Sequence, residues 1–222
     1  MLGLPLLVSE LGPVRVAHTS KDANTRRQDA FTVHRCPGPD AIGSHGMVAT
    51  VVPALAVLGT GMMAGVRSGV MAADAALRRE MVTTEELHHW LGRLRRVPGV
   101  ARARYVVGSA SARAESPGES LLRLVLVGLG LVFVEQHLIH RPDGRWARVD
   151  FYLPELDVVL EFDGMVKYGG SEGRAELAAE KHREDDIRSL GHGVARVVWA
   201  DLFSPPLVAA KIRAAARSRG RV

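Results

Sequence analysis

The sequence predicts an α/β protein built from two parts, and three observations support this prediction. Apolar and polar residues alternate as in β-strands over 145–164, which indicates a hairpin. Segments on both sides of this hairpin show helical spacing and helix-start signals. A small, polar stretch at 108–115 is typical of a domain boundary. We therefore expect a smaller, mostly helical α+β domain over 1–110 and a larger α/β domain over 116–222.

The first part is expected to begin with strands and to continue with helices. Gly59-Thr60-Gly61 carries turn chemistry and is expected to join two helices. Thr83 and Glu86 have the spacing of a capping box, so another helix should begin there and end at Pro98-Gly99. The expected elements are strands at 13–17 and 30–34, and helices at 49–58, at 62–77, after Thr83 and at 100–107.

The second part should read helix, three-stranded antiparallel meander, helix, strand, helix. Ser116 and Pro117 are a typical N-cap and first residue of a helix. Gly191 is a typical helix terminator. The expected elements are a helix at 116–128, a strand at 131–139, the hairpin, a long amphipathic helix at 171–190, a buried strand at 194–199 and a last helix from Ser204.

Positive charge is concentrated in the first half of the chain. Residues 1–114 hold 14 basic and 8 acidic side chains, whereas residues 115–222 hold 15 basic and 16 acidic ones. The last twelve residues, 211–222, add five cations without an acid. Basic patches of this kind indicate a nucleic-acid partner. For the tail alone, cations that complement the end of a helix are an equally good interpretation.

The remaining composition bounds the class of protein. Cys36 is the only cysteine, which excludes an internal disulfide or a cysteine-rich zinc site and suits a reducing cytoplasm. The opening residues lack the charged region and cleavage site of a signal peptide. Residues 47–66 are uncharged for long enough to span a bilayer, but Pro53 and three glycines interrupt them. We expect two packed helices there, with no membrane segment and a cytoplasmic location.

The hairpin carries acidic residues on a face where folding alone would not place them. If residues 154–157 form the turn, Leu153 pairs with Val158, which sets Asp150 opposite Glu161. Opposed side chains lie about 5 Å apart, and two carboxylates at that distance repel by about 3 kcal/mol at an effective dielectric of about 20. The core-facing set of this register is Val149, Phe151, Leu153, Val158, Leu160 and Phe162.

Two interpretations of these acids remain open. A divalent cation held by two carboxylates and a backbone carbonyl would offset the repulsion, because Mg²⁺ prefers oxygen ligands. Alternatively, the face is solvated, and Arg148 pairs with Asp163, which the same register sets opposite it.

Several motifs in the second part occur together in a recognisable order. They are SPGES at 116–120, RVDF at 148–151, VVLEFDGMVKY at 158–168, EKHRED at 180–185 and GVARVVWADL at 193–202. In these motifs the chain resembles the PD-(D/E)XK nuclease superfamily, and most of all the uncharacterised actinobacterial family related to very-short-patch repair endonucleases. The resemblance covers about half the chain.

This resemblance implies a restriction-endonuclease-like core that hydrolyses DNA with Mg²⁺ or Mn²⁺. It implies that Asp150, Glu161 and the backbone carbonyl of Phe162 bind the metal, with Glu119 as a further ligand. The position that usually holds the catalytic lysine is Asp163 here. Lys167 and Lys181 are the candidates for returning a cation to the site.

Each of these supporting residues also has a structural interpretation. Glu119 stands three residues after Ser116 and can close a capping box. Lys167 can be a solvated loop cation, and Lys181 can belong to ion pairs on a helix surface.

The first half resembles the region that precedes this nuclease-like unit in many actinobacterial proteins, some of which are described as abortive-infection type IV antitoxin-like regulators. Such proteins usually begin with a winged helix, and Gly3–Leu7 resembles the point just after it. The leading expectation is a DNA endonuclease. The alternatives are a catalytically inactive DNA-binding or antitoxin-like regulatory protein and a purely structural or partner-binding protein. DNA is the expected partner, and a protein partner or homodimer is left open.

Overall fold

The computed structural model of the chain describes residues 2–10, 12–17, 26–27, 31–34, 38–164 and 182–219. Helices and strands are both abundant, which confirms the predicted α/β class. The chain divides into two compact units, Met1–Pro117 and Gly118–Val222. Each unit is described by itself.

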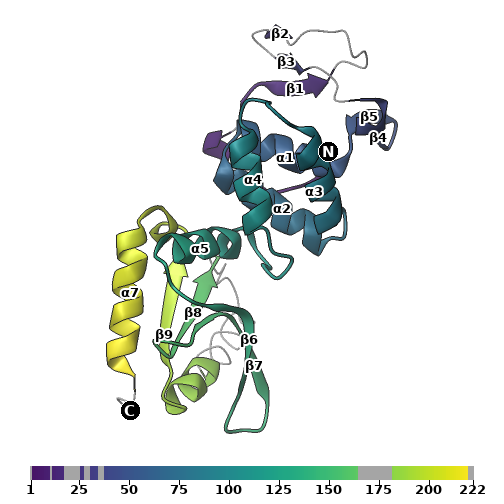
Figure 1. Cartoon of the computed structure of the whole chain (residues 1–222). Coiled ribbons are helices and arrows are strands. Elements are labelled where there is room, and N and C mark those ends of the chain that lie inside the picture. The colour runs from purple at the N-terminus through teal and green to yellow at the C-terminus, as the bar shows by residue number, and fades with distance from the viewer. Residues whose placement is uncertain are drawn as a thin grey trace, which may run out of the picture. The chain divides into compact units, whose positions relative to one another are not determined.

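The first unit consists of four helices with short strands (Figure 1). β1 and β3 pair in parallel, β2 pairs with β3 antiparallel, and β4 and β5 form a hairpin. None of the described helices is long and apolar enough to cross a membrane. The elements are η1 (Val8–Glu10), β1 (Val14–Ala17), β2 (Arg26–Arg27), β3 (Phe31–His34), η2 (Pro39–Ala41), β4 (Ile42–His45), β5 (Val48–Val51), α1 (Pro53–Met63), α2 (Val66–Arg78), α3 (Thr84–Arg93) and α4 (Val100–Ser109).

The predicted joint at Gly59-Thr60-Gly61 is wrong, because these residues lie inside α1. The chain turns instead at Gly65, whose φ of 138° is accessible mainly to glycine. Gly61 has a packing role, since a Cβ added at Gly69 of α2 would lie 2.5 Å from the Gly61 Cα. Two glycines thus let α1 and α2 approach each other closely.

The predicted helix at 49–58 is also wrong at its beginning. Residues 49–51 belong to β5, which pairs with β4 from Ile42↔Val51 to His45↔Val48. Gly46 and Met47 form the turn between the strands. The β-branched Val48 and Thr50 favour a strand, and the helix begins only at Pro53, a good first helical residue.

The capping box that starts α3 is confirmed. The Thr83 N–H donates to the Glu86 carboxylate over 2.8 Å, and the Glu86 N–H donates to the Thr83 hydroxyl over 3.2 Å. The helix ends at Arg93, before the predicted stop at Pro98, because the chain turns at Leu94 and Arg96 takes a φ of 59°.

The second unit is a four-stranded sheet with helices against it (Figure 1). The strand order is β6-β7-β8-β9, antiparallel up to β8, with β9 parallel to β8. This succession of elements is the one predicted, with residues 171–181 of the predicted long helix lying outside the described residues. They are α5 (Pro117–Gly128), β6 (Val134–His140), β7 (Trp146–Leu153), β8 (Val158–Asp163), helical residues 182–189, β9 (Gly193–Val198), η3 (Asp201–Phe203) and α7 (Pro205–Ser218).

The two faces of this sheet are covered by different helices. α7 packs so closely on β9 that a Cβ at Gly193 would lie 2.4 Å from the Ala215 carbonyl oxygen. The next ladder pair after Val158 and Gly193 is Val159 and Val194, and its side chains therefore face the opposite side of the sheet. Ile187 packs there, and residues 182–189 therefore cover the second face.

Val149 differs from its predicted placement. It is buried as expected, but it packs in a cluster with Val159, Val194 and Ile187, whereas the predicted register put it on the face of Val158. The change coincides with an interruption of strand pairing at Asp150, described below. The other predicted core residues of the hairpin are buried, except for Phe162, which is half-buried.

Candidate functional site

The candidate site lies where β7 and β8 separate. The predicted pairing of Leu153 with Val158 is confirmed, but the ladder ends at Phe151↔Leu160. The predicted register set Asp150 opposite Glu161, but the two residues are not a ladder pair, so this part of the prediction is wrong. Instead, the backbone N–H of Phe162 donates to Asp150 Oδ2 over 2.8 Å. At this fork, a side-chain carboxylate of β7 accepts the hydrogen bond that a backbone carbonyl of β7 would accept in a continuous ladder.

Glu161 is held by a cation from the protein itself. Its residue is only 8% exposed, and its Oε1 accepts a hydrogen bond from Arg183 Nη2 over 2.5 Å. Arg183 Nη1 donates to the backbone carbonyl of Arg148 over 2.9 Å. The guanidinium thus joins the two strands at their point of separation and balances the buried carboxylate. The alternative pairing of Arg148 with Asp163 stays a prediction.

The beginning of α5 is fixed against the end of β8 by a glycine. A Cβ at Gly118 would lie 2.0 Å from the Phe162 ring, so no other residue fits without displacement. The Phe162 ring meets Trp199 edge-on, with centroids 5.3 Å apart. Figure 1 shows α5 at the end of the sheet where β8 finishes. This contact brings Glu119, the next residue, to the end of the strand that carries Glu161.

One face of α5 makes buried polar contacts with β6. Gln136 Nε2 donates to Glu119 Oε2 over 2.9 Å, and Arg123 Nε lies 3.3 Å from Glu135 Oε2. Glu119 and Arg123 are four residues apart, so they occupy the same helix face. Both are 5% exposed. Buried polar groups are costly unless paired, and these contacts pair the polar groups of the α5 face with β6.

Gln136 has a strained backbone directly beside Asp150. Its φ is 54°, which costs a residue with a side chain about 1–3 kcal/mol. The neighbouring residues pair normally with β7, as Glu135↔Phe151 and His137↔Val149, while Gln136 and Asp150 between them do not. Strand pairing is therefore interrupted at Asp150 on both sides of β7. Strain of this kind is commonly retained at functional sites.

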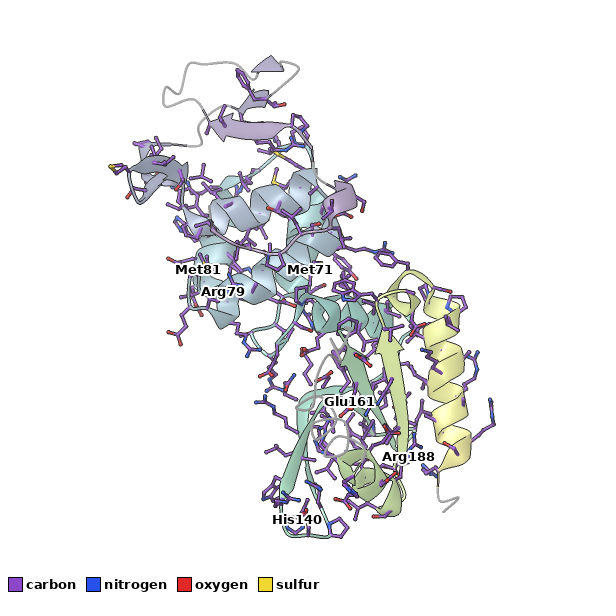
Figure 2. The ribbon with its side chains drawn as sticks, turned by 180° about the vertical axis from the view of Figure 1, so that it is seen from behind. Met71, Arg79, Met81, His140, Glu161 and Arg188 are labelled. Carbon is purple, nitrogen blue, oxygen red and sulfur yellow. The ribbon has the colours of Figure 1, made fainter. Side chains whose placement is uncertain are left out.

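Residues 182–189 are joined to the sheet by further ion pairs. Glu184 accepts from Arg196 on β9 over 3.0 Å and from Arg188 on its own helix over 2.7 Å. Asp186 pairs with Arg141 beyond the end of β6. Figure 2 shows Glu161 and Arg188 in the same unit, with His140 at the far end of the β6–β7 hairpin. The pairs of Glu184 with Arg196 and of Asp186 with Arg141 fix the helix that presents Arg183.

A separate polar cluster surrounds Asp157 in the turn between β7 and β8. The Tyr152 hydroxyl donates to Asp157 Oδ1 over 2.9 Å, and His192 Nδ1 lies 2.5 Å from the same oxygen. Burial alone would raise the pKa of Asp157, but the hydrogen bonds from His192 and Tyr152 outweigh it, and the pKa is lowered. His137 stacks on Tyr152 with centroids 4.7 Å apart. The cluster fastens the turn, at the opposite end of β8 from the fork.

The predicted metal ligands, Asp150, Glu161, Phe162 and Glu119, all lie within the described residues. Within the described ranges, no three His, Cys, Asp or Glu side chains form a group that could hold a metal ion. The oxygen-bearing groups of the fork are the carboxylates of Asp150 and Glu161, which contact the Phe162 N–H and Arg183, and the Phe162 carbonyl. Glu119, beside it, has its Oε2 on Gln136. Lys167 and Lys181 lie outside the described residues. Asp163, at the position where the resemblance leads one to expect a lysine, is half-buried at the end of β8.

Several predicted basic residues are engaged within their own units. In the tail, Lys211 Nζ binds Asp201 over 2.5 Å, and Arg219 donates to the Leu156 carbonyl over 3.2 Å. In the first unit, Arg93 pairs with Asp40, and Arg102 donates to the Met62 carbonyl over 3.3 Å. Other cations are exposed, among them Arg95, Arg96, Arg104, Arg213 and Arg217.

Sequence reasoning missed two residues of this site. Neither Arg183, which lies inside the EKHRED motif, nor Gln136 is among the residues that the sequence predicts for the site. The EKHRED motif could have suggested Arg183, because a cation on the helix after the hairpin faces the sheet. No sequence signal marks Gln136, because glutamine is not typical of a positive φ.

Comparison with known proteins finds similar chains without an assigned activity. The chain is 32% identical over 134 residues to an uncharacterised protein of Mycobacterium tuberculosis strain CDC 1551 / Oshkosh, and equally to one of strain ATCC 25618 / H37Rv. The match covers 60% of this chain and 48% of each relative. The chain thus spans about half the length of the curated relatives it matches. No family model and no solved structure matches.

Proposed function

We propose that the second unit is a metal-dependent DNA endonuclease of the PD-(D/E)XK type. The observation that carries the proposal is the bond from the Phe162 N–H to Asp150, which brings Asp150 to the residue that follows Glu161. The order of the elements, helix, antiparallel meander, helix, strand and helix, is what the resemblance predicts and supports the proposal further.

The donors at the fork fit a hard cation. In an extended strand the N–H and C=O of one residue point to the same side, so the Phe162 carbonyl is directed toward β7 together with the N–H that binds Asp150. Asp150, Glu161 and this carbonyl would hold Mg²⁺ or Mn²⁺, which use one or two carboxylates together with substrate phosphates. When bound, such a cation supplies Lewis-acid polarisation of a phosphate oxygen.

The residues around the fork would position the substrate and the ligands. The backbone bond fixes the Asp150 carboxylate, and the close approach of Gly118 to the Phe162 ring holds the start of α5, which carries Glu119, against the end of β8. Gln136 orients the Glu119 carboxylate. Arg183 supplies a positive charge near the developing charge of a phosphate, the role for which the sequence offers Lys167 and Lys181.

A catalytically inactive DNA-binding or antitoxin-like regulatory protein is the second candidate. Two observations favour it: Asp163 occupies the position of the usual lysine, and Glu161 is already neutralised by Arg183. In that case the acids and Arg183 would be a structural remnant. DNA binding would then persist without cleavage and would weaken steeply with salt.

Plasmid cleavage tests the choice between these candidates. Supercoiled DNA is incubated with Mg²⁺ or Mn²⁺ and the wild type, Asp150→Ala or the control Asp143→Ala, which removes an aspartate from the β6–β7 loop. Metal-dependent nicking by the wild type and the control, lost in Asp150→Ala, would support the endonuclease. Equal cutting by Asp150→Ala, or no cutting by a wild type that binds DNA, would contradict it.

A further inference from the structure

Arg183 occupies one of the two carboxylates that the proposed function assigns to a cation. Its guanidinium binds Glu161 Oε1 through Nη2 and the Arg148 carbonyl through Nη1. The Glu161 side chain is 11% exposed and that of Arg183 27% exposed, so solvent screens the pair only weakly. The metal-free protein thus already carries a positive charge at this carboxylate.

A divalent cation and the guanidinium would repel each other at this position. Both would contact the carboxylate of Glu161, which sets them within a few ångströms, where charges that solvent screens weakly interact strongly. Hydrogen bonds to Glu161 and to the Arg148 carbonyl are made by the tip of the long Arg183 side chain, and its helix has its own anchors in Glu184 and Asp186. The side chain can therefore leave Glu161 while the helix stays in place.

We propose that Arg183 is an exchangeable counter-ion, which holds Glu161 in the metal-free protein and is displaced from it when a divalent cation binds. This inference rests on the proposed function, because it requires a metal at the fork. Once displaced, the guanidinium remains beside the fork, where it can bind a phosphate oxygen of DNA. Arg183 is then a positioning residue for the metal site and a phosphate ligand in the loaded complex.

Mn²⁺ binding to the full chain, measured by electron paramagnetic resonance without DNA, provides the first test. Arg183→Gln removes the competing charge and should tighten Mn²⁺ binding by about tenfold or more. Arg188→Gln is the matched control, because Arg188 lies on the same helix and pairs with Glu184. Its Mn²⁺ affinity should equal that of the wild type. A residue that only stabilised the fold would weaken metal binding when replaced.

The possible results separate this inference from the proposed function. Unchanged or weaker binding in Arg183→Gln, while Asp150→Ala still abolishes binding, would overturn the role of Arg183 and leave the metal site intact. Mn²⁺ binding that is absent, or unaffected by Asp150→Ala, would overturn both.

A second measurement uses the wild type and does not depend on how a variant folds. Phenylglyoxal modifies arginines that are not held in ion pairs, and mass spectrometry reports the rate at each residue. Saturating Mn²⁺ should accelerate modification of Arg183 severalfold and leave Arg188 unchanged. Equal Arg183 rates with and without saturating Mn²⁺ would show that the pair with Glu161 persists and would overturn the exchange.

Discussion

Asp150 Oδ2 lies 2.8 Å from the backbone nitrogen of Phe162 and accepts its hydrogen bond at the point where the β7–β8 ladder has ended. The carboxylate therefore has a structural role, independent of any metal. Asp150→Ala removes the acceptor and should lower the free energy of unfolding by about 1.5–3 kcal/mol. Asp150→Asn keeps an oxygen acceptor and should cost less than about 1 kcal/mol, although it loses the charge.

Urea denaturation of the three proteins measures these differences. If Asp150→Ala and Asp150→Asn lose equal amounts of unfolding free energy, the charge of Asp150, and not its hydrogen bond, stabilises the fork. If the proposed function holds, Asp150→Asn should be nearly as stable as the wild type. It should nevertheless lose metal-dependent cleavage, as Asp150→Ala does. This separates the structural role of the residue from its chemical one.

Gly118→Ala should destabilise the second unit by about 1–3 kcal/mol or more, because its Cβ would overlap the Phe162 ring. Gly128→Ala at the other end of α5 is the control, since nothing lies within 4 Å of an added Cβ there. Combining Gly118→Ala with Phe162→Leu should recover part of the loss. Thermal unfolding of the four proteins tests this, and a Gly118→Ala variant as stable as the Gly128→Ala variant would refute the close contact.

At position 136, a glycine variant should be more stable than an alanine variant, which is the reverse of the usual order of stability in a strand. Both Gln136→Gly and Gln136→Ala lose the amide that binds Glu119, but only alanine retains the strain of a φ of 54°. The glycine variant should therefore be more stable than the alanine variant by about 1 kcal/mol, whereas in an ordinary strand it would be less stable. Chemical denaturation gives the difference, and a more stable alanine variant would mean that the backbone at residue 136 is unstrained.

Acidification should remove the stability that Asp157 contributes. The pKa of this carboxyl is lowered, since the raising effect of burial is outweighed by hydrogen bonds from His192 and Tyr152 and by the nearby Arg219. A carboxyl whose pKa is lowered on folding stabilises the folded chain when the pH is above its pKa in the unfolded chain, about 3.9. This contribution disappears as the pH falls through its lower pKa in the folded chain.

Asp157→Asn tests this dependence, because asparagine tolerates the positive φ of 51° at this position. The stability difference between wild type and variant should be largest above about pH 5 and should shrink on further acidification. A difference that stays constant between neutral and acidic pH would exclude an ionised Asp157 as the source of the stabilisation.

The register of the central hairpin could be predicted because local features determine it. The turn at Pro154–Asp157 fixes the pairing of Leu153 with Val158, and alternation selects the buried side. The capping box at Thr83 was predictable for the same reason, since both hydrogen bonds lie within four residues. Glycines predict local structure less reliably, because the same residue suits a turn or a close helix contact. Gly61 lies in a close contact between α1 and α2, where the sequence had indicated a turn between two helices.

The features that the sequence could not predict depend on tertiary contacts. Two acids at this spacing indicate that a positive charge is needed, but not whether a metal or a distant arginine provides it. Arg183 reaches Glu161 from 22 positions away along the chain, through a fold that brings its helix onto the sheet. The interruption at Gln136 likewise coincides with a tertiary contact, the hydrogen bond from Gln136 to Glu119, which no alternation pattern contains.

The most direct test of the central claim, that Asp150 and Glu161 share one divalent cation, is iron-mediated backbone cleavage. Fe²⁺ is added in place of Mg²⁺ with ascorbate and peroxide, so that radicals cut the chain near the bound ion, and mass spectrometry locates the cuts. Cuts near residues 150 and 161 that excess Mg²⁺ suppresses and that Asp150→Ala abolishes are the expected result. Cuts confined to other segments, or cuts at the fork that persist in Asp150→Ala, would contradict a cation site at this position.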